Sequence, residues 1–130
     1  MVETSAQEDT WIMCYGSNTP RQLCERIKTP YEAILERMCA VKLHGYKRGF
    51  CNRGGRWDNK SVATLYESGE QTDFVEGVAV RLTATEVAAL DPFEGYPDWY
   101  NRENITLDAF MKVDGASKKS WTKIPAQAYI

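Results

Sequence analysis

A four-residue segment, Tyr15-Gly-Ser-Asn18, could bind an anion. It follows an apolar run and precedes a proline, so we predict a strand that turns sharply into a helix capped by Asn18 or Thr19. Such a turn points backbone N–H groups and the positive end of the helix dipole at one spot, where a carboxylate fits. Gly16 would permit close approach, and the Ser17 and Asn18 side chains could donate hydrogen bonds. The alternative is a helix cap preceded by a turn glycine.

A second candidate for chemistry is the carboxyl group of Glu94. The spacing of Val87 and Leu90 predicts one apolar helical face, and Glu94 joins that face if the helix continues through Pro92. Apolar neighbours would then raise the pKa of the carboxyl, as a general base near neutral pH requires. The alternative is structural: Asp91 as N-cap, Pro92 at the first position and Glu94 at the third would form a capping box satisfied by its own backbone.

A third candidate is the stretch from Lys42 to Trp57, which carries five basic and three aromatic residues and no acidic residue. This mixture could bind single-stranded nucleic acid through phosphate contacts and base stacking. Alternating strand positions would instead place many of the charges on a solvated face. Because the whole chain has a net charge of -2, it has no general attraction for nucleic acid. We therefore expect this stretch to be a solvated strand and not an RNA-binding site.

Several kinds of chemistry are excluded by what the sequence lacks. With His44 as the single histidine and no metal-binding cysteine spacing, we expect no metal site. His44 could serve a serine or cysteine as a base, but it falls within a predicted strand and the chain has no GxSxG motif. No P-loop or GxGxxG is present either. These absences direct attention to carboxylates and backbone donors.

The composition indicates one cytoplasmic domain. A chain of 130 residues with 43% hydrophobic side chains can bury a core without disulfides, and the spacing of the four cysteines favours reduced thiols. No apolar run approaches the roughly 20 residues that span a bilayer, so we expect no membrane association. We expect a disordered tail over residues 1–10 and a single domain over 11–130.

Hydrophobic periodicity predicts an α+β fold. Strands are expected at 11–15, 38–51, 61–66, 74–82, 104–110 and 121–130. One short helix should bury Leu23 and Ile27, and another should begin with the capping-box pattern Thr83-Ala-Thr-Glu86 and stop or kink at Pro92. An Asp114-Gly115 turn should join the last two strands. With only two short helices, a curled or closed mixed sheet with helices packed outside is the most economical arrangement.

Taken together, these residues resemble the γ-glutamylcyclotransferase and AIG2-like superfamily. The resemblance rests on an apolar strand ending in YGSN, a glycine-containing segment before "VATLY", and "VEGVAVRL" followed by "LDPFEGYPDWYNR", in that order. It implies a small mixed β-barrel with flanking short helices and a cavity around the YGSN loop.

The resemblance also implies an activity. Enzymes of this family let the α-amine of a γ-glutamyl group attack its own γ-carbonyl, which forms 5-oxoproline and releases the attached amine. By position, Glu94 matches the catalytic glutamate, and Tyr15, Gly16, Ser17 and Asn18 match the loop that holds the glutamyl moiety. Tyr129 matches a tyrosine on the last barrel strand.

Such an enzyme, of acyltransferase or lyase type, needs no cofactor and takes a small-molecule γ-glutamyl substrate, such as a dipeptide, glutathione or a γ-glutamylamine. This chain departs from the family at Thr19, where leucine is frequent, and it ends after the last strand, where larger cyclotransferases continue. Two alternatives stay open beside the enzyme: an inactive small-molecule binder on the same barrel, and an RNA-binding domain that uses the stretch from Lys42 to Trp57.

Overall fold

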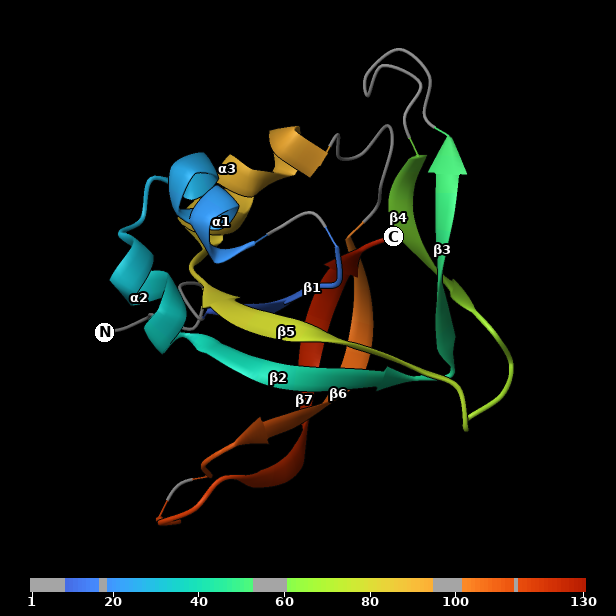
Figure 1. Ribbon diagram of the computed structural model, residues 1–130. Helices are drawn as coiled ribbons and strands as arrows, with labels where there is room; N and C mark the ends of the chain where they lie inside the picture. Colours follow the sequence, from blue (N-terminus) through green and yellow to red (C-terminus); the bar gives the residue numbers. More distant parts are fainter. Residues whose placement is uncertain (1–8, 17–18, 53–60, 95–101, 114) are drawn as a thin grey trace.

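A five-stranded barrel forms the centre of the protein in the computed structural model, which describes residues 9–16, 19–52, 61–94, 102–113 and 115–130 (Figure 1). The barrel is closed in the order β1-β5-β2-β6-β7, and β3 and β4 form a separate two-stranded sheet. The described strands are β1 (Thr10–Cys14), β2 (Met38–His44), β3 (Tyr46–Asn52), β4 (Ser61–Glu67), β5 (Phe74–Leu82), β6 (Arg102–Met111) and β7 (Ser120–Tyr129). The helices are α1 (Pro20–Ile27), α2 (Tyr31–Glu36) and α3 (Ala84–Glu94).

Two hydrophobic cores lie on the two faces of the barrel sheet. Successive side chains of a strand point to opposite faces, so a strand buried on both sides supplies both cores. On β1, Met13 faces the barrel interior, whereas Ile12 packs outward against the helices. The three helices gather on this side of the barrel, and the β3–β4 hairpin stands on the other side (Figure 1). The expected α+β barrel with short helices outside is therefore confirmed.

Helix α2 is an element that the sequence analysis missed. It has only six residues, follows Pro30 and lacks a side-chain cap. Its inward contact is made by Ile34, which is fully buried. Because a helix of fewer than two turns cannot display a 3.6-residue repeat, its sequence carries no periodic signal.

The strand expected over 38–51 is two strands that meet at Gly45. Gly45 has a φ of 84°, in the left-handed region that favours glycine. Its N–H donates to the carbonyl of Asp73 at 2.8 Å, and its carbonyl accepts from the N–H of Ser68 at 2.9 Å. This corner turns the chain out of the barrel, so β3 pairs with β4 while β2 stays paired with β5 and β6.

Two of the barrel's five seams are short. Strand β6 pairs with β7 along its whole length, but its ladder with β2 comprises only Ala40↔Phe110, Val41↔Ala109 and Lys42↔Asp108. The parallel contact of β1 with β7 has a single registered pair, Ile12↔Gln127. The barrel thus consists of a three-stranded half (β1, β5, β2) and a two-stranded half (β6, β7) that meet along these two seams.

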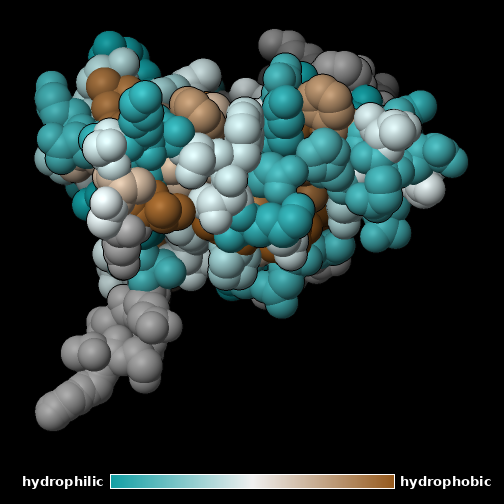
Figure 2. All heavy atoms as spheres, turned by 90° about the horizontal axis from the view of Figure 1, so that it is seen from below, coloured by the Kyte–Doolittle hydropathy of each residue, from teal (hydrophilic) through white to brown (hydrophobic). Residues whose placement is uncertain are grey.

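The surface carries hydrophobic side chains in separate patches. Seen from below, brown patches are set among hydrophilic residues and do not merge into one face (Figure 2). Phe74, Phe110 and Trp121 are among the exposed large side chains. None of the helices in the described residues is long and apolar enough to cross a membrane.

The corner at Gly45 yields a stability prediction. Gly45→Ala should lower the free energy of unfolding by about 1–2 kcal/mol, because a Cβ destabilises a left-handed backbone. That Cβ would also lie 2.9 Å from Nε2 of Gln71 and displace its side chain. The control is Gly69→Ala, where φ is 80° and no heavy atom lies within 4 Å of the added Cβ, so only the backbone cost remains.

Urea unfolding of both variants measures the effect. A Gly45→Ala protein as stable as the parent would show that the corner does not depend on glycine.

Candidate active site

The strand and the helix predicted on either side of the YGSN segment are both present. Strand β1 ends at Cys14, and α1 begins at Pro20 with Thr19 as its N-cap. The Thr19 hydroxyl accepts from the N–H of Gln22 at 3.2 Å, and the Gln22 side chain accepts from the N–H of Thr19 at 3.1 Å. This capping box fixes the start of the helix. Ser17 and Asn18 lie outside the described residues, so their proposed roles stay predictions.

Close backbone packing positions the end of β1. Strand β5 passes next to it at Gly77, where a Cβ would lie 2.5 Å from the carbonyl oxygen of Cys14. Backbone cannot yield to such a contact, so only glycine allows β1 and β5 to approach each other this closely. The position of Tyr15, the next residue after β1, thus depends on the absence of a side chain at Gly77 of β5.

The structure brings together two of the predicted site residues, Tyr15 and Tyr129. The Tyr15 hydroxyl donates to the backbone carbonyl of Tyr129 at 2.5 Å and so links β1 to β7 beside their short seam. The Tyr129 side chain is buried, with 3% of its surface exposed, and its hydroxyl donates to Oδ1 of Asp91 at 2.6 Å. A buried tyrosine needs such a partner for its hydroxyl.

Asp91 joins the end of α3 to both strands of the two-stranded half, a role that the sequence analysis did not assign to it. Besides Tyr129 of β7, Nε of Arg102 on β6 donates to Asp91 Oδ1 at 2.9 Å. The Arg102 side chain also donates to Gln127 Oε1 at 3.2 Å, and Gln127 in turn donates to Asn104 Oδ1 at 3.0 Å. The side chain of Asp91 is only 17% exposed, which strengthens these charge-assisted hydrogen bonds.

Glu94 is the last residue of α3, and its side chain lies outside what the structure describes. The expectation was that Pro92 stops or kinks the helix. The helix continues through Pro92, so a stop is excluded, and the capping-box alternative with Asp91 as N-cap is wrong. Leu90, at 0% exposure, and Val87, at 6%, form the buried face of α3. Glu94 comes four residues after Leu90 and seven after Val87, so its position in the helix falls on the same face. Asp91, three residues before Glu94, ties this part of the helix to the barrel.

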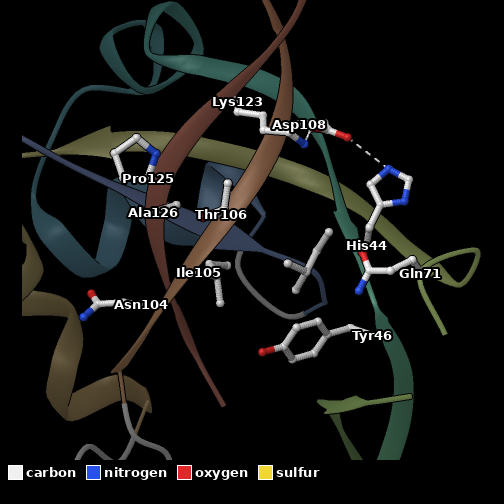
Figure 3. Close-up of a pocket in the computed structure, with 11 residues that line it drawn as sticks. His44, Tyr46, Gln71, Asn104, Ile105, Thr106, Asp108, Lys123, Pro125 and Ala126 are labelled. Carbon is white, nitrogen blue, oxygen red and sulfur yellow. Dashed lines mark hydrogen bonds and ion pairs between the residues drawn. The ribbon is translucent and has the colours of Figure 1, made fainter. Parts of the chain in front are cut away.

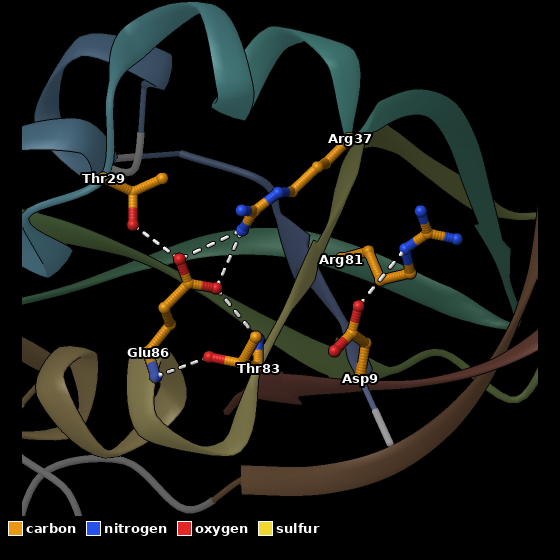
Figure 4. Close-up of polar contacts among 6 residues, drawn as sticks. All are labelled: Asp9, Thr29, Arg37, Arg81, Thr83 and Glu86. Atoms are coloured by element: carbon orange, nitrogen blue, oxygen red, sulfur yellow. Dashed lines mark hydrogen bonds and ion pairs between the residues drawn. The ribbon is translucent and has the colours of Figure 1, made fainter. Parts of the chain in front are cut away.

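The N-terminus of α3 is held by a second carboxylate, that of Glu86 (Figure 4). The predicted capping box is present: Glu86 Oε1 accepts from the N–H of Thr83 at 2.9 Å, and the Thr83 hydroxyl accepts from the N–H of Glu86 at 3.2 Å. Glu86 also accepts from the hydroxyl of Thr29, between α1 and α2, and from Arg37, between α2 and β2, at 2.8 Å. One carboxylate therefore connects all three helices.

These contacts set the pKa of Glu86. Burial alone would raise it, but hydrogen bonds from the Thr29 hydroxyl, the Thr83 N–H and the Arg37 guanidinium together lower the pKa below its ordinary value. The carboxylate is thus held in its charged form.

In the stretch from Lys42 to Trp57, the described lysine and arginine side chains contact other groups of the same chain. Lys42 Nζ lies 5.0 Å from the ring centroids of Phe74 and Trp121, and Arg48 donates to the carbonyl of Glu76 at 3.1 Å. Lys47 Nζ lies 3.9 Å from a carboxylate oxygen of Asp73. Arg53, Arg56 and Trp57 fall outside the described residues, as does the side chain of Phe50.

No group of three or more histidine, cysteine, aspartate or glutamate side chains within the described ranges could hold a metal ion. Cys14, Cys24 and Cys39 form no disulfide.

Comparison with solved structures identifies the fold. A structure described as a γ-glutamyl cyclotransferase superimposes with a TM-score of 0.72 over 95% of this chain and 66% of its own length, at 18% identity. An uncharacterized protein, LOC79017 from Homo sapiens, gives 0.68 over 95% and 67%, at 19% identity. A yeast γ-glutamyl cyclotransferase specific to glutathione gives 0.59 over 95% and 69%, at 13% identity. This chain therefore spans about two-thirds of the length of these proteins.

Residues 12–130 match the family model described as γ-glutamyl cyclotransferase, AIG2-like. The chain belongs to this family, and the resemblance inferred from the YGSN and EGYP segments is confirmed. No curated protein sequence matches the chain.

The network around Glu86 predicts a pH-dependent contribution to stability. A carboxylate whose pKa is lowered on folding stabilises the protein above its unfolded-state pKa of about 4.3, and this contribution is lost as the pH falls through the lower folded-state value. Glu86→Gln keeps the capping geometry but loses the charge paired with Arg37. We expect the free energy of unfolding at pH 7 to fall by about 1–3 kcal/mol, with a smaller loss at pH 3.

The control is Glu25→Gln, at an exposed position within α1, which should change the stability little at either pH. Urea unfolding at the two pH values measures both variants. An equal loss at pH 7 and pH 3 would mean that the charge of Glu86 does not contribute.

Proposed function

We propose that this protein is a γ-glutamylcyclotransferase that converts a γ-glutamyl compound into 5-oxoproline and the free amine. The observation that carries the proposal is the continuity of α3 through Pro92 to Glu94, together with the anchoring of Asp91 to Tyr129 and Arg102. Tyr129 also accepts from Tyr15, so the end of α3 is connected to the start of the YGSN segment through two hydrogen bonds. Membership of the family supports the same reaction.

Glu94 would serve as the general acid and base. The substrate's α-ammonium must lose a proton before its nitrogen can attack the γ-carbonyl, and a nearby carboxylate can accept that proton. Attack forms the C–N bond of the five-membered ring. After attack the ring nitrogen still carries a second proton that the lactam must lose. Collapse of the tetrahedral intermediate breaks the bond to the leaving nitrogen, which takes the first proton from Glu94, and the carboxylate so regenerated passes the second proton from the ring nitrogen to the released amine. Both half-steps use one carboxyl group, and no external reactant is consumed.

The YGSN segment would hold the α-carboxylate of the glutamyl group. Backbone N–H groups of this segment, which leads into the N-terminus of α1, would donate to an anion there. Fixing this carboxylate folds the glutamyl chain so that its amine lies next to its γ-carbonyl, which converts binding energy into proximity. Tyr15 and Tyr129 would support the segment through their mutual hydrogen bond.

The first test of the proposal is Glu94→Gln. Because an amide can neither accept the ammonium proton nor return it, we expect the rate of 5-oxoproline formation to fall at least about a hundredfold. The variant should melt within a few degrees of the parent and still bind a γ-glutamyl ligand. Purified protein is incubated with γ-glutamyl dipeptides, glutathione and γ-glutamyl-lysine, and 5-oxoproline is quantified by mass spectrometry.

Glu25→Gln serves as the matched control and should turn over normally. If the folded Glu94→Gln protein forms 5-oxoproline at the parental rate, Glu94 is not the base. If the parent binds these compounds and forms no 5-oxoproline from any of them, the protein is a binder and not an enzyme.

The second test concerns the α-carboxylate of the substrate. A γ-glutamyl dipeptide amidated at this carboxylate loses charge-assisted hydrogen bonds, each contributing about 1.5–3 kcal/mol, so kcat/KM should fall about tenfold to a hundredfold. The control is the same dipeptide amidated at the carboxylate of the leaving amino acid, which should change kcat/KM less. Equal effects of the two amidations would exclude the YGSN segment as the specific α-carboxylate site.

A further inference from the structure

A groove of about 600 Å³ runs along the seam where β2 leaves β6. Its volume lies in the range of ligand-binding pockets. The groove exists because Gly45 turns the chain from β2 into β3, so that the β2–β6 ladder ends at Lys42↔Asp108. Neither Tyr15 nor Tyr129 is among the described residues that line it.

The wall of the groove is the edge of β6 that faces β2. Strand β6 pairs with β7 over Glu103–Leu107, but among the described strands its opposite edge has no ladder partner beyond Asp108. On this edge, the N–H and C=O groups of every second residue point into the gap. Open strand edges of this kind bind extended polypeptide segments through main-chain hydrogen bonds.

The floor of the groove is apolar and reaches the barrel core. Leu43, Ile105 and Ala126 line it, with 2%, 8% and 6% of their surfaces exposed. An aliphatic side chain of a bound segment would therefore find apolar contacts there, and burying it would favour binding.

The charges at the rim compensate one another. Asp108 receives Lys123 Nζ at 2.9 Å on one carboxylate oxygen and His44 Nε2 at 3.0 Å on the other. Figure 3 shows the side chains of His44 and Asp108 directed at each other across the gap between β2 and β6. An ionic ligand would have to compete with these pairs, whereas the amides of Gln71 and Asn104, which also line the groove, can hydrogen-bond to neutral peptide groups.

We propose that this groove binds an extended polypeptide segment with an aliphatic side chain and uncharged neighbours, which adds to β6 as a further strand. The open edge supplies main-chain hydrogen bonds, the apolar floor takes the aliphatic side chain, and the compensated rim selects against charged residues. The proposal does not depend on the cyclotransferase activity, because it rests on the free edge of β6 and on the lining of the groove and makes no use of Glu94.

The test uses a defined probe, acetyl-Thr-Val-Thr-Val-Thr-amide, titrated into the uniformly ¹⁵N-labelled full chain. We expect amide shifts concentrated at Leu43 and at Asn104 to Thr106. A peptide N-methylated at all five residues has lost every backbone donor for strand pairing, whichever direction the segment runs, so it should bind at least about tenfold more weakly. A version with aspartate in place of valine should also bind more weakly, because it brings an unpaired charge to an apolar floor.

Two matched substitutions locate the binding surface. Thr106→Trp, at an exposed position that lines the groove, should weaken binding at least tenfold. Ala40→Trp, at an exposed position of β2 outside the groove, should leave binding unchanged. If Thr106→Trp does not fold, Thr106→Arg replaces it.

Three results would overturn the proposal. The first is the absence of shifts at about 5 mM peptide, a concentration above the Kd of any useful binding. The second is equal binding of the N-methylated and unmethylated peptides. The third is a set of shifts confined to the region of Tyr15 and Gly16. The last result would place the peptide at the candidate active site. Because the readout is binding, it is independent of whether 5-oxoproline is formed.

Discussion

The carboxylate of Glu86 is the contact on which the arrangement of the helices depends. It caps α3 through Thr83, fixes the α1–α2 connection through Thr29 and fixes the α2–β2 connection through Arg37. Each of these contacts lies where a helix begins or ends, and the one to Thr83 satisfies a backbone N–H at the start of α3. The orientation of α3 relative to the barrel follows from them, and with it the position of the residue at the other end of the helix.

The two ends of α3 carry carboxylates with different roles. Glu86 is fully engaged in structural contacts, and Asp91 is engaged with Tyr129 and Arg102. Glu94 follows one turn after Asp91, behind a proline that cannot donate to the preceding turn. The tether of Asp91 to β6 and β7 therefore compensates for the weakened backbone ladder at the place where the proposed base is located.

Much of the fold could be predicted from the sequence, because buried strands and capping boxes leave local patterns. The strand over 74–82 and the helix starts at Thr19 and Thr83 are examples. The break at Gly45 was not predicted because the apolar alternation continues on both sides of it. Helix α2 was not predicted because a helix of fewer than two turns shows no periodicity. The partners of Asp91 and Tyr15 could not be predicted, since Tyr129 lies 38 and 114 residues away from them.

The two short seams of the barrel have a consequence for its dynamics. Separating the three-stranded half from the two-stranded half breaks the three registered pairs between β2 and β6 and the single pair between β1 and β7, while the longer ladders stay intact. Such an opening costs less free energy than global unfolding, so interior amides beside the seams should exchange with solvent through a local fluctuation. The Tyr15–Tyr129 hydrogen bond and the His44–Asp108 contact lie beside these two seams, so this opening has to break them as well.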